Sequence, residues 1–468
     1  MRGAPTAAVL ACALAGCLAH DAWRAAAPLE REGELHVYLQ PLPRGAERLA
    51  LGLASIEALS TTGETVPLRL IAPDVSGAEA PAQRLLARGR LAPGSYAGLL
   101  LRFRSARLVA PQGASDLPVA AEPRRVDSPF AVAARRAVVL ALTLETPRPP
   151  EAGKAFEPRL AAAVGRMPLP QRAAFCSDAA GHALAVVDKH DRQVVGVLPT
   201  GRGPEGLALD ARPSRVYLAL SGEDQVAVVD VGTGDEVLRF PLRPGDRPRE
   251  VALSADGRTL VVTNPGSNSV AFLDASSGME LGRIDTGQAP GPLLLDRGGQ
   301  RGYVLNQVSS TLTAFDVRSR TVTATASTEA QPVRAGLNRA GTRLYVAHAA
   351  SPNVAVLSLP TLAPAGRLVV GAGAGALLVD SRTDLVYVAS RDRGRVQIFD
   401  PFSLMPVSEI EVPAPVTWMA IDDAENALFA LMPAARAVAV VDLSTGRQSA
   451  SFDVGEAPYQ LTMAGERR

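Results

Sequence analysis

A repeat of fixed length is the feature that most constrains this chain. From residue 173 onward, a short aliphatic run closes on Asp in six copies and on Ser in one, at spacings of 42, 44, 42, 42, 42 and 42 residues. Such a period indicates a repeat architecture, in which each unit buries its faces against its neighbours. The closing residues are Asp188, Asp230, Asp274, Asp316, Ser358, Asp400 and Asp442.

Each unit contains four short apolar runs separated by turn residues. After Asp230, a Gly-Thr-Gly turn leads to an apolar run at 236–240, and a Gly/Pro loop at 245–248 leads to runs at 250–253 and 260–263. The pattern has no 3.6-residue period over a helical length, so it predicts strands. Four short antiparallel strands in each of seven units predict an all-β fold with a seven-bladed β-propeller over residues 173–466.

The two ends of the repeat region complement each other. The first unit begins at 173–176 without the strand that follows the Gly/Pro loop in the other units, and the chain ends on that missing piece at 459–463. We therefore predict that the C-terminal segment forms the innermost strand of the first blade. Ring closure of this kind removes an exposed end blade.

The strand motifs of the repeat resemble a known family. Tyr345-Val346-Ala347-His348 and Tyr303-Val304-Leu305-Asn306, with the Gly-x-x-Pro loop and the closing aliphatic-Asp strand, are similar to the YVTN-repeat (YncE-like) β-propellers. The resemblance implies the propeller fold and carries almost no information on activity.

Residues 33–165 do not follow the repeat. Leu35, Val37 and Leu39 alternate with other residues, as do the apolar residues of 138–144. Period two predicts half-buried strands of an antiparallel β-sandwich. With the turn at 91–96, these strands resemble a lipoprotein-associated β-sandwich family of unknown function, similar to Ig-like or prealbumin-like domains.

The N-terminus resembles a lipoprotein signal. Arg2 precedes an apolar stretch at 7–15 that is too short to span a bilayer, and Leu14-Ala15-Gly16-Cys17 resembles a bacterial lipobox. The resemblance implies a signal peptide at 1–16, a lipid anchor on Cys17 and a tether at 17–32. In the lipoproteins that this N-terminus resembles, a non-acidic residue after the cysteine, here Leu18, favours the outer membrane of the cell envelope, with the periplasmic or surface face left open. An ordinary secretory signal with an incidental cysteine is the alternative.

Composition narrows the partners. The chain has 48 basic and 47 acidic residues and only 4% aromatic residues, so we expect no nucleic-acid binding. Cys176 is the single cysteine beyond Cys17, which excludes an internal disulfide and predicts a small, packed strand residue. We expect a monomer.

Strand order places the Gly-x-x-Pro loops and the ends of the Tyr-Val-Ala-like strands on one rim of the ring. The polar residues there predict a partly cationic site for a small anionic or carbohydrate ligand or a peptide. Local turn capping is the alternative role for the Asn and Ser residues. The candidate rim residues are Arg249, Glu250, Asn264, Asn306, Arg334, His348, Ser390 and Asp392. The residues expected at the start of the inner strands are chemically mixed: Gly206, Glu250, Pro292, Arg334, Ala376, Trp418 and Gln460.

No catalytic or metal site is predicted. His348 has no second histidine at a spacing that forces proximity, which argues against a metal or haem ligand. The Asp residues that close the repeats lie one per blade, so we expect them to cap turns and not to gather around calcium.

These observations predict a non-catalytic envelope lipoprotein without cofactors. Its propeller would bind or scaffold a protein, a peptide or an envelope polymer, and its membrane contact would be the lipidated Cys17. The alternative is a propeller enzyme, either a lactonase-like hydrolase or a cofactor-binding oxidoreductase.

Overall fold

The computed structural model describes residues 28–43, 45–77, 81–110, 113–145, 151, 153–210 and 214–467. The predicted all-β class is confirmed: strands dominate these residues, and the helical segments among them are the short 3-10 turns η3 (Pro170–Arg172) and η4 (Pro433–Ala435). None of the helices in the described ranges is apolar and long enough to span a membrane. The lipobox residues and Cys17 lie outside the described residues.

The repeat region contains six four-stranded antiparallel sheets, which is consistent with a β-propeller. Five of these sheets contain four consecutive strands. The first sheet contains three consecutive strands and the last strand of the chain. Their bounds are β12 (Ala173–Asp178), β13 (Ala183–Asp188), β14 (Gln193–Pro199) and β39 (Pro458–Met463); β15 (Pro204–Asp210), β16 (Arg215–Leu220), β17 (Gln225–Asp230) and β18 (Glu236–Pro241); β19 (Val251–Leu253), β20 (Thr259–Asn264), β21 (Ser269–Asp274) and β22 (Glu280–Asp285); β23 (Pro290–Leu295), β24 (Arg301–Asn306), β25 (Thr311–Asp316) and β26 (Thr321–Ser327); β27 (Pro332–Leu337), β28 (Arg343–His348), β29 (Asn353–Ser358) and β30 (Ala363–Val369); β31 (Ala374–Val379), β32 (Val386–Ser390), β33 (Arg395–Phe399) and β34 (Pro406–Glu411).

The last repeat supplies four strands to a larger sheet. They are β35 (Trp418–Asp422), β36 (Ala427–Met432), β37 (Ala437–Asp442) and β38 (Arg447–Asp453).

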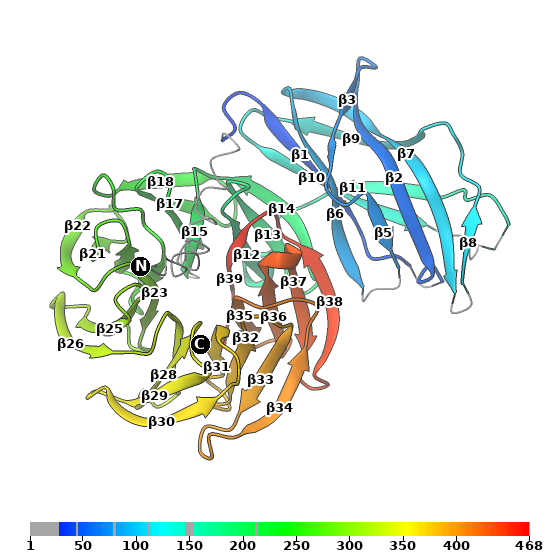
Figure 1. Cartoon of the computed structure of the whole chain (residues 1–468). Helices are drawn as coiled ribbons and strands as arrows, with labels where there is room; N and C mark the ends of the chain where they lie inside the picture. The colour runs from blue at the N-terminus through cyan, green and yellow to red at the C-terminus, as the bar shows by residue number, and fades with distance from the viewer. Residues whose placement is uncertain are drawn as a thin grey trace, which may run out of the picture.

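The sheets are arranged in a ring (Figure 1), and the axis at the centre of that ring is referred to below as the channel. Their innermost strands contact one another in a closed circle in the order β39, β15, β19, β23, β27, β31 and β35, and then β39 again. The predicted pairing of the two ends is confirmed, because β39 pairs antiparallel with β12 and sets Leu461 opposite Cys176. Cys176 is fully buried, as expected.

The repeated aspartates hold the turns that follow them, as predicted. Asp230, Asp400 and Asp442 each accept backbone N–H groups two and three residues further along the chain. The same turn occurs at Asp274, which accepts the N–H groups of Ser276 and Ser277 and both serine hydroxyls. Each carboxylate thereby orients one tight turn between the third and fourth strands of its sheet.

The aspartates in these turns make the free energy of unfolding depend on pH. The hydroxyl of Ser276, with the N–H and hydroxyl of Ser277, lowers the pKa of Asp274 to about 2, and similar bonds lower the pKa values of Asp316, Asp400 and Asp442. An unfolded Asp titrates near about 4. Since the folded pKa values lie below the unfolded value, the stabilisation is complete above about pH 4 and is lost as the pH falls toward about 2.

We therefore expect the thermal midpoint to fall through this pH window, and Asp274→Asn to flatten its pH dependence. Thermal melts at closely spaced pH values check this expectation. A variant that melts with the same pH slope as the parent chain would contradict it.

The N-terminal strands form two sheets around a separate apolar cluster. The first sheet orders its strands β11-β10-β1-β6, with β4 paired to β6, and the second orders them β3-β2-β7-β8, with β5 on β2 and β9 on β7. Their bounds are β1 (Gly33–Leu39), β2 (Leu49–Ser60), β3 (Thr65–Pro67), β4 (Arg69–Leu70), β5 (Asp74–Ser76), β6 (Ala82–Leu91), β7 (Gly94–Ala110), β8 (Gly113–Leu117), β9 (Arg124–Val132), β10 (Ala137–Glu145) and β11 (Arg159–Val164).

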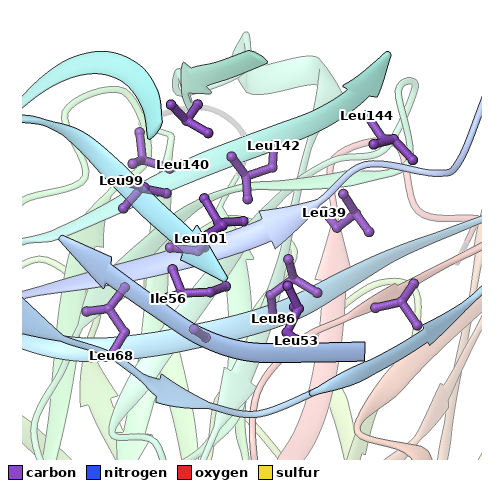
Figure 2. Packing of buried hydrophobic residues seen from close by; sticks show 14 of the residues in the cluster. Leu39, Leu53, Ile56, Leu68, Leu86, Leu99, Leu101, Leu140, Leu142 and Leu144 are labelled. Carbon is purple, nitrogen blue, oxygen red and sulfur yellow. The ribbon is translucent and has the colours of Figure 1, made fainter. Parts of the chain in front are cut away.

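The predicted apolar faces lie in this cluster. Leu35, Val37 and Leu39 of β1 are buried together with Leu140 and other residues of both sheets. Figure 2 shows leucines from β1, β2, β6, β7 and β10 converging between the two layers. Period two in the sequence therefore identified the side of each strand that faces this core.

Two expectations for this region are wrong. The pairing is not wholly antiparallel, because β1 and β10 run parallel. The strand β1 is also not half-buried: Tyr38, on the face of the strand opposite Val37, belongs to a second core that it shares with Val139 and with the sheets of the ring. That second face is buried because the first sheet continues into the ring through β6, which pairs parallel with β38.

Gln83 of β6 fixes this junction. Its side chain is fully buried, donates to the carbonyl of Val194 at 3.1 Å and accepts the N–H of Val194 at 2.7 Å. Asp453 accepts the backbone N–H of Leu85 at 2.9 Å, and Arg88 forms an ion pair with Glu456. The N-terminal sheets are thus joined to both the first and the last sheets of the ring, beside the ring closure.

Candidate functional site

The candidate site lies at one end of the channel, where the innermost strands begin. Successive repeats bring the two residues that follow the loop proline to equivalent positions in the ring. In the third repeat the proline Pro248 is followed by Arg249 and Glu250, and at the chain end Pro458 is followed by Tyr459. Because these positions face the channel from different sheets, residues distant in sequence meet there.

A chain of hydrogen bonds crosses the channel at this level. Arg334 donates from Nη1 to Glu250 Oε1 at 2.6 Å, and the Tyr459 hydroxyl donates to the same oxygen at 3.3 Å. Arg249 donates from Nε to the Tyr459 oxygen at 3.0 Å. The three sheets that supply these residues are therefore connected through one carboxylate and one phenol.

Arg249 also has partners on two further sheets. Its Nη1 donates to Gln307 Oε1 at 2.7 Å, and its Nε lies 3.4 Å from Glu205 Oε2. The contact with Tyr459 and then the negative charge of Glu205 raise the pKa of Arg249 above its usual value. Burial raises the pKa of Tyr459, so its hydroxyl keeps its proton and can donate to Glu250.

Trp418 extends the contacts to the last sheet. The Arg334 guanidinium lies over the indole ring, 4.1 Å from the ring centroid, in cation–π geometry. The indole Nε1–H is buried and has no hydrogen-bond partner among the residues the structure describes. We refer to Glu205, Arg249, Glu250, Gln307, Arg334, Trp418 and Tyr459 together as the channel-mouth cluster.

The negative and positive charges of the cluster lie at different depths. The side chains of Glu250 and Glu205 are only 4% and 9% exposed, whereas that of Arg249 is 31% exposed. The carboxylates therefore lie deeper than the Arg249 guanidinium. A ligand that approaches the mouth meets positive charge first, held in place by partners beneath it.

Three predicted residues have a different role. Asn264, Asn306 and His348 end equivalent strands but are fully buried. The amide of Asn306 donates to the hydroxyls of Thr311 and Thr313, across its own hairpin. His348 Nδ1 lies 3.4 Å from the carbonyl of Asn353, also in the next strand, and burial lowers the pKa of His348. The structure does not bring these side chains to the channel-mouth cluster.

The last two predicted rim residues contact each other. The Ser390 hydroxyl donates to Asp392 Oδ1 at 2.7 Å and thereby lowers the pKa of Asp392. This bond closes a local turn. Of the predicted rim residues, Arg249, Glu250 and Arg334 are therefore those that meet at the channel.

Sequence reasoning did not assign Glu205, Gln307 and Tyr459 to the site, and it placed Trp418 on an inner strand without a role. Glu205 and Tyr459 occupy the same repeat position as Arg249, one residue after the loop proline. Comparing that position among all repeats would have identified both. Gln307 lies after the second strand of its sheet and has no such signal.

Within the described ranges, no group of three or more His, Cys, Asp or Glu residues has the arrangement needed to hold a metal ion. The chemistry available at the mouth is therefore that of paired guanidinium and carboxylate groups, one phenol and one indole N–H.

The fold and this site define an all-β protein that consists largely of four-stranded antiparallel sheets around a channel. No family model matches the chain, and no curated protein matches it. Among solved structures, dihydro-heme d1 dehydrogenase NirN in complex with DHE is similar over 64% of this chain and 76% of that chain, at 12% identity and a TM-score of 0.50. Hydrazine synthase of Kuenenia stuttgartiensis matches 52% of this chain and 77% of that chain, at 16% identity and a TM-score of 0.47. The likeness to NirN extends to the β-propeller-like fold alone.

Proposed function

We propose that the chain is a cell-envelope lipoprotein in which an N-terminal β-sandwich is joined to a seven-bladed, YVTN-type β-propeller. The closed circle of innermost strands and the repeat spacing support the seven blades. The two apposed N-terminal sheets support the sandwich. The lipobox-like sequence that ends at Cys17 supports the anchor, which would hold the protein at the outer membrane.

We propose further that the propeller is a non-catalytic binding module, with the channel-mouth cluster as its binding site for a protein or peptide of the envelope. The observation that carries this proposal is the cross-channel chain Arg334–Glu250–Tyr459–Arg249. It fixes charged and aromatic groups from several blades before any ligand arrives, which reduces the entropy cost of binding.

The state of the carboxylates favours binding over catalysis. A general base needs a carboxylate that is available to a substrate proton. Glu250 instead accepts bonds from both Arg334 and Tyr459 at one oxygen and is buried. It therefore serves to position the arginine and the phenol.

A capture experiment tests the proposed site. The intact protein and the variants Arg249→Gln and Arg334→Gln are used to retain partners from envelope extracts, with Arg247→Gln as a matched control. Arg247 is exposed in the loop just before the cluster, so its replacement removes the same charge without touching the cluster. We expect a partner that is retained by the parent and the control and lost from both cluster variants.

Equal retention by all four proteins would contradict the assignment of the site. The enzyme alternative, a hydrolase or an oxidoreductase, has its own measurement. A stoichiometric metal or a coloured cofactor in the purified protein, found by metal analysis and an absorption spectrum, would overturn the non-catalytic proposal.

A further inference from the structure

The channel-mouth cluster also indicates which chemical group it recognises. This inference rests on the proposed function, because it concerns the ligand of the same site. The relevant observation is which hydrogen-bond donors remain after the internal contacts are made.

Both arginines use only part of their donor capacity. A guanidinium carries five N–H donors in a planar fork and no acceptor. Arg249 uses Nε and Nη1, and Arg334 uses Nη1. Within the described ranges, Nη2 of Arg249 and both Nε and Nη2 of Arg334 have no hydrogen-bond partner. The indole N–H of Trp418, beneath Arg334, is a further donor without a described partner.

These donors belong to one small region. The two guanidinium groups are separated only by the Tyr459 hydroxyl and the Glu250 carboxylate, which form the bridge between them. Two acceptor atoms of the cluster are already engaged: Glu250 Oε1 by Arg334 and Tyr459, and Gln307 Oε1 by Arg249. The cluster therefore holds several unused donors, and among its arginines Arg249 is the more exposed, at 31% against 14% for Arg334.

We propose that the channel mouth takes a carboxylate-bearing ligand, such as a peptide with a free C-terminal carboxylate, and holds that carboxylate with Arg249 and Arg334. A carboxylate matches the guanidinium fork in shape and charge and accepts from both of its nitrogens. Glu250 and Glu205 are the internal counter-ions that keep Arg334 and Arg249, respectively, in place when the site holds no ligand.

Trp418 provides the readout. The chain has two tryptophans, so Trp23→Phe leaves Trp418 as the single emitter. A carboxylate that binds Arg334 changes the position and the charge environment of the guanidinium that lies on the indole. The fluorescence of Trp418 therefore changes on binding. The probes are N-acetyl-triglycine and its C-terminal amide, which differ in charge at one end and are added to the full chain.

We expect the acid to produce a saturable change and the amide to need at least about a tenfold higher concentration, because charge-assisted hydrogen bonds are about twice as strong as neutral ones. Arg249→Gln should weaken the acid by a similar factor, and Arg247→Gln should not. A thermal midpoint equal to that of the parent shows that the Arg249→Gln protein is folded, and Arg249→Lys provides a second variant that keeps the charge and loses the fork.

Equal binding of acid and amide, or of the acid to parent and Arg249→Gln proteins, would overturn the carboxylate assignment. A response to a neutral sugar with none to the acid would overturn it as well. If the probe fails while capture from extracts still depends on Arg249 and Arg334, only this inference fails. If capture is also independent of both arginines, the proposed function fails with it.

Discussion

Deletion of residues 458–468 is expected to lower the thermal midpoint by at least about 10 °C. The deletion removes β39, whose Leu461 and Met463 are buried against β12 and its neighbours. Loss of their burial alone costs about 5 kcal/mol. It also removes the tail of the chain, where buried Arg467 contacts Asp380 at 3.2 Å and Asp423 at 2.8 Å and so joins three sheets. Calorimetry or circular dichroism measures the midpoint.

Two point variants control for the deletion. Leu461→Ala should cost about 2–5 kcal/mol, since a cavity remains where the side chain was. Val322→Ala, at an exposed position of an outer strand, should change stability by less than about 0.5 kcal/mol. A deletion mutant with the midpoint of the parent would show that β39 does not hold the ring closed.

Replacement of Lys189 by Met is expected to cost about 3–5 kcal/mol of unfolding free energy. Lys189 Nζ lies 2.7 Å from Asp422 Oδ1 and donates to the carbonyl of Ala464, at 2.7 Å. The two side chains are 6% and 0% exposed, so the variant leaves Asp422 charged, buried and without its cation. Urea denaturation measures the loss.

The double variant Lys189→Met with Asp422→Leu should regain most of that loss, because it removes the unpaired charge as well. The matched comparison is Arg239 with Glu236, a pair whose side chains are 35% and 32% exposed. Arg239→Ala should cost at most about 1 kcal/mol. If the Lys189 and Arg239 variants lose the same stability, the buried pair does not hold the closure.

The strands of the repeats could be predicted because their causes are local. The run at 260–263 and the turn before it lie within a few residues of each other, and the structure places β20 over Thr259–Asn264. The ring closure could also be predicted by comparing units, because the first unit begins with the strand at 173–176 and lacks the strand before it, which occurs instead at 459–463. The structure pairs these two strands.

The site was only partly predictable. The register of the repeat placed Arg249, Glu250 and Arg334 at the channel, but the identity of their partners depends on which side chains reach across it. Tyr459 lies 210 residues from Arg249 in sequence. Asn306 and His348 share the register of rim residues, yet local hydrogen bonds within their hairpins keep them buried.

The junction between the two parts of the molecule had no signal at all. The strands β6 and β38 pair through Ser451 with Ala82 and Phe452 with Gln83, about 370 residues apart. A parallel contact this short leaves no period in the sequence. The absence of a sequence signal for this junction also explains why β1 was expected to be half-buried. The alternation of Leu35, Val37 and Leu39 identifies one buried face of the strand and gives no information on the other face.

The same junction determines how mechanical load travels through the molecule. Tension applied to the chain ahead of β1 cannot be absorbed by a swinging linker, because β6 is hydrogen-bonded to β38 and Gln83 is bonded to Val194 on the first sheet. The force passes instead into the two sheets on either side of the closure. The N-terminal sheets therefore connect the first and last sheets of the ring, and we expect them to resist separation of these two sheets when the N-terminal chain is pulled.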